Sequence, residues 1–309
     1  QPLFFNIINM NTRKYLYIVA FVFLFANVSF AAKWKAKHVV LIGLDGWGAY
    51  SVEKAEMPTV KKLMAEGSYT LKKRSVLPSS SAVNWASMFM GAGPELHGYT
   101  EWGSRTPELP SRVLSKDGIF PTVFGLLRES DAKAEIGCVC EWKGIRYVID
   151  TLALSYDKHV AEASKEPDAT ARYAVDYIKS AKPNLCAVIF DNPDHVGHAD
   201  GHDTPEYYNM LKVLDGYIAQ IVEAVKEAGI LDDTIFIVTS DHGGIKKGHG
   251  GKTMQEMETA FIISGKGIKK GYEFTESMMQ FDTAATIAHI FNLKQPQVWI
   301  GRPMVQVFK

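Results

Sequence analysis

The sequence has few cysteines and no surplus of charge of either sign. Only three of its 309 residues are cysteine (Cys138, Cys140 and Cys186), and no Cys-x-x-Cys pair occurs. Three cysteines are too few for a disulfide scaffold, and the absence of such pairs argues against a thiolate metal site. Cys138 and Cys140 stand two residues apart in an apparent strand, so we expect them to be ordinary core residues.

The charges balance, with 34 Lys and Arg against 34 Asp and Glu and a sequence pI near 7.3. This balance provides no general attraction to a nucleic-acid polymer or to a membrane surface, so neither is expected as a stable partner. With 22% charged and 47% apolar residues, the chain is not a charged disordered tail and can bury a large core. An anionic substrate must therefore be bound by a local site.

Long apolar runs are also lacking, and the most apolar segment lies near the N-terminus. Arg13 and Lys14 precede an apolar run over residues 15–26, and the small residues Ser29 and Ala31 suit cleavage after Ala31. The run is shorter than the roughly 20 residues of a membrane span, with an uncleaved anchor as the alternative. We expect an N-terminal extension and signal peptide over residues 1–31, export to the periplasm or secretion, and a single catalytic domain over residues 32–309.

Apolar strands alternate with helical segments from His38 onward. The predicted buried strands are His38–Leu44, Glu135–Cys140, Leu185–Phe190, Thr234–Thr239 and Ala260–Ile263. The predicted helices are Pro58–Glu66, Asn84–Met90, Pro121–Arg128, Ala169–Ser180, Pro205–Ala228 and Phe281–Phe291. This order predicts an α/β fold in which a mostly parallel central sheet carries helices on both faces. Ligands of such sheets bind beyond the carboxyl ends of the strands.

Carboxylate and imidazole side chains follow the predicted strands at that edge. They are Asp45, Asp194, His198, Asp241, His242 and His249. Such ligands without thiolates suit Zn²⁺, with Mn²⁺ or Fe as alternatives. A catalytic zinc usually has about three protein ligands and an open position, so this set predicts two metal ions.

Ser81 is the candidate nucleophile. It stands near the start of the predicted helix Asn84–Met90, where free backbone N–H groups and the helix dipole favour an anion. Metal coordination activates a serine hydroxyl without a general base. The alternative is that Ser79–Ser81 only cap the helix, as serine often does. The nearby metal ligands favour the catalytic interpretation.

Five motifs occur in a characteristic order along the chain. They are Asp45-Gly46, a Pro-x-x-Ser segment ending at Ser81, Gly91-x-x-Pro94-Glu95-x-His97-Gly98, Pro193-Asp194-x-x-x-His198 and Ser240-Asp241-His242-Gly243. Together they resemble the alkaline phosphatase superfamily, and most closely its type I phosphodiesterase/nucleotide pyrophosphatase branch. The resemblance covers nearly the whole chain after the signal segment.

The resemblance implies an alkaline-phosphatase-like fold and a two-zinc hydrolase of small-molecule phosphate esters that forms a covalent phospho-enzyme. It implies that one metal is bound beside the nucleophile by Asp45, Ser81, Asp241 and His242. It assigns the second metal, which would activate the hydrolytic water, to Asp194, His198 and His249.

The sequence also departs from that branch. Phosphodiesterases of the branch usually have threonine where Ser81 stands and a phosphate-binding asparagine at the position of Trp102. The short loop between His242 and His249 is more like sulfatases, but Val83 and Trp85 replace the Pro and Arg of the sulfatase nucleophile segment. A phosphomonoesterase therefore stays open as the main alternative, with a sulfatase-like hydrolase or a non-catalytic metal-binding protein less favoured.

Five residues are candidates for substrate binding: Asn84, Trp102, Lys143, Arg146 and Lys252. The three cationic ones follow a strand or a metal ligand and could bind phosphate oxygens; the alternative is solvated loops. Asn84 could instead hold the first helical turn, and Trp102 could be a core or rim aromatic. His97 is expected to be structural, and Lys72-Lys73-Arg74 to be a solvated strand face.

Overall fold

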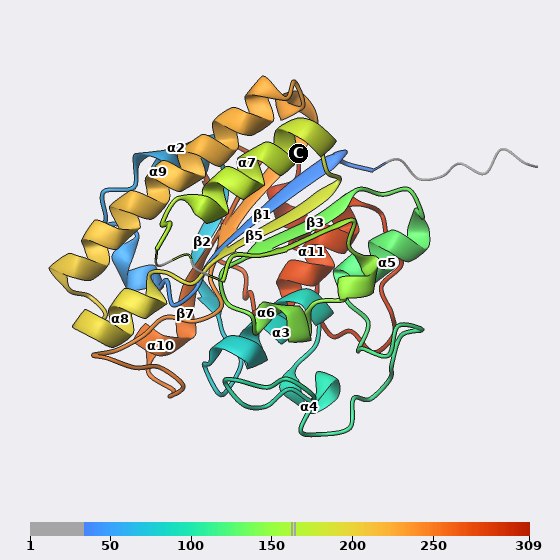
Figure 1. Ribbon diagram of the computed structural model, residues 1–309, viewed down its shortest axis with the longest axis horizontal. Coiled ribbons are helices and arrows are strands. Elements are labelled where there is room, and N and C mark those ends of the chain that lie inside the picture. The colour runs from blue at the N-terminus through green and yellow to red at the C-terminus, as the bar shows by residue number, and fades with distance from the viewer. Residues whose placement is uncertain (1–33, 162, 164) are drawn as a thin grey trace, which may run out of the picture. The chain divides into compact units, whose positions relative to one another are not determined.

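The order of strands in the central sheet brings distant segments of the chain together. The computed structural model describes residues 34–161, 163 and 165–309, which contain an eight-stranded sheet in the order β4-β3-β5-β1-β6-β7-β2-β8 (Figure 1). The strands β4, β3, β5, β1 and β6 run parallel, whereas β7 is antiparallel to both β6 and β2. The predicted α/β class with a mostly parallel sheet is confirmed.

The bounds of the elements agree closely with the sequence prediction along the centre of the sheet. The strands are β1 (His38–Leu44), β2 (Gly67–Arg74), β3 (Ile136–Cys140), β4 (Tyr156–His159), β5 (Leu185–Phe190), β6 (Thr234–Thr239), β7 (Glu258–Gly265) and β8 (Tyr272–Glu273). The longer helices are α2 (Pro58–Glu66), α3 (Ser81–Met90), α5 (Val123–Ser130), α7 (Ala169–Ala181), α9 (Pro205–Glu227) and α11 (Asp282–Ile290). The short helices include α4 (Pro94–His97), α6 (Ile145–Val148), α8 (Asp194–Asp200) and α10 (Met254–Met257).

Each face of the sheet has its own apolar core. Helices α2, α7 and α9 cover one face, and α3, α5 and α11 cover the other (Figure 1). Successive residues of β1 alternate between them: Leu41 packs in the core with α3, and Ile42 packs in the core with α9. A strand that is buried on both faces reads as a continuous apolar run, which explains why the central strands were predictable. Cys138 and Cys140 are buried and free in β3, as expected.

Lys73 corrects one prediction. Lys72 and Arg74 are exposed on β2, but Lys73 is completely buried and donates a hydrogen bond from Nζ to the carbonyl oxygen of Ser240 at 2.7 Å. Side chains of a strand alternate between faces, and here the face that holds Lys73 is covered. Burial lowers the pKa of Lys73 to about 7. The interpretation of all three as a solvated face was therefore wrong for Lys73.

The structure also bears on the N-terminal prediction. Among residues 34–161, 163 and 165–309, no helix combines the length and apolar character that a membrane span needs. The expected signal segment over residues 1–31 lies outside the described residues.

Candidate active site

The loops that follow β1, β5 and β6 are bound to one another at the carboxyl edge of the sheet. The backbone N–H of Asp194 donates to the carbonyl oxygen of Asp45 at 3.0 Å, and the N–H of Gly46 donates to Oδ1 of Asp241 at 3.2 Å. Gly46 has a φ of +70°, and a Cβ there would lie 2.6 Å from Cβ of Asp194. Because this contact is too short for any other residue, the glycine is what allows the two loops to approach so closely.

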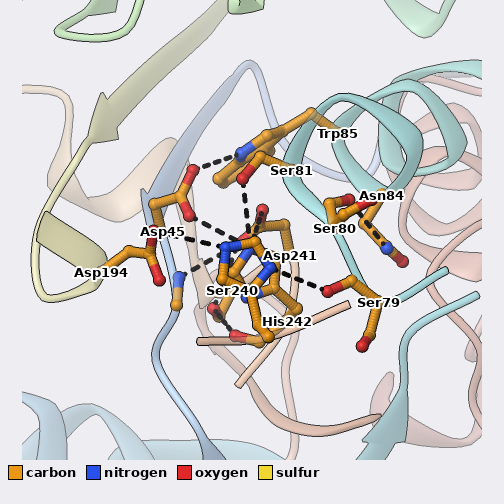
Figure 2. A network of polar contacts seen from close by, with 12 residues as sticks. Asp45, Ser79, Ser80, Ser81, Asn84, Trp85, Asp194, Ser240, Asp241 and His242 are labelled. Atoms are coloured by element: carbon orange, nitrogen blue, oxygen red, sulfur yellow. Dashed lines mark hydrogen bonds and ion pairs between the residues drawn. The ribbon is translucent and has the colours of Figure 1, made fainter. Parts of the chain in front are cut away.

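One group of possible metal ligands lies below Ser81 (Figure 2). It consists of Asp45, Asp241 and His242 and is called the buried group here. Nε2 of His242 lies 3.4 Å from Oδ1 of Asp45 and 3.3 Å from Oδ2 of Asp241, and all three residues are buried. Nδ1 of His242 lies 2.7 Å from the carbonyl oxygen of Gly243. Because a carbonyl oxygen only accepts hydrogen bonds, Nδ1 carries the proton of the imidazole, and the lone pair of Nε2 can bind a metal ion.

The carboxylates of the buried group have oxygens without a partner. Oδ1 of Asp45 and Oδ2 of Asp241 are buried and accept no hydrogen bond from any described residue. Burial, followed by repulsion from neighbouring carboxylates, raises the pKa of Asp45 well above its usual value, and burial raises the pKa of Asp241 to about 8. Two orphaned carboxylate oxygens facing an unprotonated imidazole nitrogen are a donor set that fits a divalent cation.

A second group of possible metal ligands lies beside the buried group. It consists of Asp194, His198 and His249 and is called the open group. Oδ2 of Asp194 is 3.1 Å from Nε2 of His198 and 3.6 Å from Nε2 of His249, and the two Nε2 atoms are 3.1 Å apart. Asp194 and His198 are one helical turn apart on α8, which places them on the same helix face. Nδ1 of His198 contacts the carbonyl of Lys247, and Nδ1 of His249 that of Ser79. Both Nε2 atoms are therefore available as ligands.

The electrostatics of the open group differ from those of the buried group. Burial alone would raise the pKa of Asp194, but the hydrogen bond to His198 and the charges of the nearby imidazoles hold this pKa below its usual range. The same hydrogen bond is the main cause that raises the pKa of His198 to about 9. The single carboxylate of this group is thus paired with imidazoles even without a cation.

Ser81 points toward the buried group from the first residue of α3 (Figure 2). Its Oγ lies 3.1 Å from Nε2 of His242. The backbone N–H of Ala82 donates to the carbonyl oxygen of Trp102 at 3.0 Å, which ties the start of this helix to the loop that carries Trp102. The helix begins three residues earlier than predicted, so Ser81 lies in its first turn rather than before it.

Asn84 holds the loop in front of Ser81. Its Oδ1 accepts from the N–H of Val76 at 2.7 Å, and its Nδ2 contacts the carbonyl oxygens of Val76, Pro78 and Ser80 at 3.0–3.2 Å. Asn84 is completely buried and all its polar atoms are used. The structure therefore gives Asn84 the local role that was the alternative to phosphate binding.

A pocket of about 710 Å³ opens above Ser81 and the open group. It is lined by Pro78, Ser80, Ser81, Thr100, Glu101, Trp102, Trp142, Asp191, Asp194, His195, His198, His249 and Gly250. Trp102, one of the five candidates for substrate binding, belongs to this wall. The cationic candidates Lys143, Arg146 and Lys252 do not line it.

Arg146, a candidate for substrate binding, is bound to a neighbouring strand. Its Nε and Nη2 bind Oδ2 of Asp157 at 2.9 and 2.6 Å. Asp157 lies on β4, the edge strand next to β3, and β3 precedes Arg146 in the chain. The guanidinium is engaged by this neighbour rather than directed into the pocket.

Among the pocket residues that were not predicted as substrate-binding candidates are Ser80, Trp142 and Asp191. Asp191 directly follows β5 and Trp142 closely follows β3, so the strand-end rule could have indicated both. Ser80 could not have been found in this way. It is the residue before α3, yet its hydroxyl makes no capping bond and has no partner in the described chain, although the residue is only 4% exposed.

Comparison with known proteins agrees with this geometry. The model of the type I phosphodiesterase/nucleotide pyrophosphatase family matches residues 39–124 and 128–283, more than half of the chain. Among curated proteins, mouse bis(5'-adenosyl)-triphosphatase enpp4 is 25% identical over 67% of this chain and 47% of its own length. Venom phosphodiesterase CdcPDE of Crotalus durissus collilineatus is 22% identical over 66% of this chain and 26% of its own length. The chain thus spans less than half the length of these two relatives.

Solved structures share the fold. Murine ectonucleotide pyrophosphatase/phosphodiesterase 5, solved as an inactive variant with AMP, superposes with a TM-score of 0.70 at 16% identity, over 88% of this chain and 98% of that one. The 2-O glycosaminoglycan sulfatase BT1596 superposes with a TM-score of 0.69 at 16% identity, over 88% and 74% of the two chains. With the family match, these likenesses show that the chain belongs to the type I phosphodiesterase/nucleotide pyrophosphatase family and has an alkaline-phosphatase-like fold.

Proposed function

We propose that this protein hydrolyses phosphodiesters of small molecules, with Ser81 as the nucleophile and a phosphoserine intermediate. The observation that carries the proposal is the position of Oγ of Ser81, 3.1 Å from Nε2 of His242 at the base of a 710 Å³ pocket. The buried group and the open group both lie at this point, so charge that develops on a phosphate there meets two cation sites.

The two groups fit two zinc ions. The buried group with Ser81 would hold one ion and the open group the other, because oxygen and imidazole donors without thiolate suit zinc. Bound there, the ions would stabilise negative charge on the phosphate oxygens and favour the ionised forms of the serine hydroxyl and of water.

The residues of the chain then divide the reaction into two displacements. In the first, the hydroxyl of Ser81 gives its proton to solvent and Oγ forms a bond to phosphorus while the bond to one alcohol oxygen breaks; the leaving alcohol takes up a proton from solvent. In the second, a water molecule gives a proton to solvent and its oxygen forms a bond to phosphorus while the bond to Oγ breaks; Oγ takes up a proton and the phosphomonoester leaves. The start of α3 faces the phosphate with its helix dipole, and the unpartnered hydroxyl of Ser80 can donate to a non-bridging oxygen.

The composition of the pocket favours a diester over a monoester. A phosphomonoester brings a second negative charge, and the cationic side chains that would compensate it are absent from the wall, because Lys143, Arg146 and Lys252 do not line it. The phosphomonoesterase alternative therefore loses the support of these three cationic side chains, while Trp102 at the position of the phosphate-binding asparagine stays a departure from the phosphodiesterase branch.

We also infer export of the mature protein. The support is the basic, apolar and small-residue layout of residues 13–31 in the sequence. N-terminal sequencing of the exported protein should give a start at Ala32, and retention of residues 1–31 would contradict cleavage.

The mechanism is tested with zinc-loaded protein and bis(p-nitrophenyl) phosphate. Ser81→Ala should lower kcat/KM by about 10³-fold or more, because alanine has no hydroxyl to form the covalent bond. Ser81→Thr, which keeps a hydroxyl, is the matched control and should retain most of the turnover. Zinc content measured by mass spectrometry should stay near that of the wild type in both. Full activity of Ser81→Ala would contradict the covalent route.

A further inference from the structure

The two carboxylate oxygens of Asp194 lie near different histidines. Oδ2 is the oxygen near His198 and His249 in the open group, whereas Oδ1 lies 3.5 Å from Nε2 of His202. Both Oδ1 of Asp194 and Nε2 of His202 are buried, and neither has a hydrogen-bond partner in the described part of the chain. Buried polar atoms are rarely left without a partner, so a small movement that joins these two would satisfy both.

The imidazole of His202 is enclosed by protein. Its side chain is 0% exposed, and His202 is not among the residues that line the 710 Å³ pocket. A Cβ at Gly197 would lie 2.4 Å from Cε1 of the ring, and a Cβ at Gly244 would lie 2.3 Å from the same atom. Neither glycine has a positive φ, so the space for the ring and not the backbone conformation requires glycine there. The two glycines form a cradle that fixes the ring beside Asp194.

The backbone of His202 joins the two segments that carry the open group. Its N–H donates to the carbonyl oxygen of Lys246 at 2.6 Å. His202 follows α8, which carries Asp194 and His198, and Lys246 lies in the loop after β6 that carries His249. The ring of His202 is therefore placed where these two segments meet.

We propose that His202 is a positioning residue for the open group: Nε2–H of His202 donates a hydrogen bond to Oδ1 of Asp194 and so directs Oδ2 toward the metal ion. An imidazole donates from Nε2 in one of its neutral tautomers and in its protonated form, so the bond needs no particular charge state. Carboxylates that bind metals are themselves hydrogen-bonded by outer partners, which orient them. Hydrogen bonds in active sites often shorten when the reacting molecules bind. The inference rests on the proposed function, because it takes the open group to bind a metal ion.

Direct binding of the metal ion by His202 is the alternative. The three side chains of the open group have ligand atoms within 4.8 Å of one another, and His202 is outside that set. Nε2 of His198 and Nε2 of His249 are 3.1 Å apart and both lie near Oδ2 of Asp194, whereas Nε2 of His202 lies near Oδ1. His202 is thus placed to act through Asp194.

The experiment measures the affinities of both zinc ions by competition with a chelator of known zinc affinity, in the intact protein without substrate. His202→Leu keeps a side chain of similar bulk but has no donor. It should weaken one zinc by about 10- to 100-fold, the usual cost of losing an outer partner of a ligand. The weakened site should be the one that His198→Ala removes. Unchanged affinities at both sites, or an equal loss at both, would overturn the inference.

Conservative variants separate positioning from packing and from direct ligation. The amide nitrogen of glutamine takes nearly the place of Nε2, so His202→Gln should keep the zinc affinity within about threefold. The amide of asparagine is one carbon shorter and does not reach Oδ1, so His202→Asn should lose as much affinity as His202→Leu. This pair of amides gives the answer even if His202→Leu does not fold. Equal affinities in the two amide variants would overturn the inference.

A matched control is available in another buried histidine. His38 lies at the opposite end of β1 from Asp45, and its Nδ1 bonds to the carbonyl oxygen of Pro183 at 2.8 Å. His38→Leu removes this buried bond at a distance from the site and should change neither zinc affinity. A loss equal to that of His202→Leu would show that the effect follows from general destabilisation and would contradict the inference.

Gly197 tests the role of the ring independently. Gly197→Ala should push the ring of His202 away from Asp194 and weaken the same zinc, although alanine suits the interior of α8 better than glycine. When combined with His202→Ala, which removes the ring, Gly197→Ala should have no further effect. Additive losses would contradict an action through the ring.

Zinc binding and catalysis are measured separately, so their failures can be distinguished. Selective loss of one zinc in His202→Leu, with no hydrolysis of bis(p-nitrophenyl) phosphate by the wild type, would support the role of His202 while the proposed function fails. Hydrolysis by the wild type with unchanged zinc affinities in His202→Leu would overturn the inference and leave the proposed function standing. A protein that binds no zinc at the open group would contradict both.

Discussion

The buried group and the open group are built from the same kinds of side chain but differ in exposure and in charge balance. The His242 side chain is 0% exposed, whereas that of His198 is 49% exposed. The buried group has two carboxylates and one imidazole, and the open group has one carboxylate and two imidazoles. The buried group is positioned by the ends of β1 and β6, and the open group by α8 and the loop after β6.

This difference indicates that the two groups have different roles in the reaction. The buried group keeps two unpartnered carboxylate oxygens in the protein interior, so it gains most from a cation and has little freedom to rearrange. The open group is internally paired and faces the pocket, where water and product must enter and leave. We expect a metal ion in the buried group to bind the nucleophile Ser81, and a metal ion in the open group to activate the water of the hydrolytic step.

Removal of metal should have the largest effect. Dialysis of the intact protein against a strong chelator should lower kcat/KM for a phosphodiester by about 10³-fold or more, since several kcal/mol of charge stabilisation are lost. Added zinc should restore the activity. Steady-state kinetics with metal analysis of the same samples measure this, and full activity of demonstrably metal-free protein would refute the account.

Substitution of one carboxylate in each group should change stability in opposite directions. In metal-free protein at pH 7, Asp241→Asn should raise the free energy of unfolding by about 1–3 kcal/mol, because the Asp241 carboxyl, whose pKa burial raises to about 8, must take up a proton on folding at this pH and the amide does not. Asp194→Asn should lower it, because Asp194 is paired with His198 and His249. Denaturant unfolding measures both values. Shifts of the same sign would show that the two groups do not differ in charge balance.

A buried imidazole outside both groups separates the effect of burial from that of metal binding. His97 lies outside both groups, its Nε2 bonds to Oγ of Ser87 at 2.9 Å, and burial lowers its pKa to about 3, below the 6.5 of an exposed histidine. As the pH falls below 6.5, the unfolded chain takes up this proton first. The stability present above pH 6.5 is therefore lost toward pH 3.

The expected slope for His97 is about 1.4 kcal/mol per pH unit. His97→Gln should flatten the pH dependence of unfolding between pH 6 and 4 by roughly this amount, with zinc content unchanged at pH 7. Denaturant titrations at several pH values provide the measurement. An unaltered slope in the variant would show that His97 is not held neutral by burial.

The smallest expected effect concerns the rate of metal release. Mixing zinc-loaded protein with a colorimetric chelator should give two phases that differ several-fold in rate, because the half-exposed His198 gives the chelator access and the buried group does not. His198→Ala should remove the fast phase and leave the slow one. Loss of the slow phase instead would show that the open group, and not the buried group, releases its zinc slowly.

The central sheet and its functional edge could be predicted because one physical pattern encodes both. Strands buried on both faces appear as uninterrupted apolar runs, and β1, β5 and β6 have the predicted bounds. Parallel strands end at a common edge, so the sequence predicts that Asp45, Asp194 and Asp241 lie close together there.

The remainder depends on contacts that no local pattern contains. The loop before α3 is held by hydrogen bonds from the side chain of Asn84, whereas the hydroxyl of Ser80, the residue that precedes the helix, makes no capping bond. Arg146, on α6, is bound to Asp157 on the edge strand β4, a contact that no local pattern in the sequence indicates. Lys73 is buried because the sheet face around it is covered, although its neighbours in the chain are charged and exposed.

Anomalous diffraction at the zinc edge, from crystals of the full chain grown with zinc, tests the two-metal account most directly. The account predicts two peaks, one within bonding distance of Asp45, Asp241 and His242, and one within bonding distance of Asp194, His198 and His249. Oγ of Ser81 should contact the first. A single peak, or peaks away from these six side chains, would contradict the account.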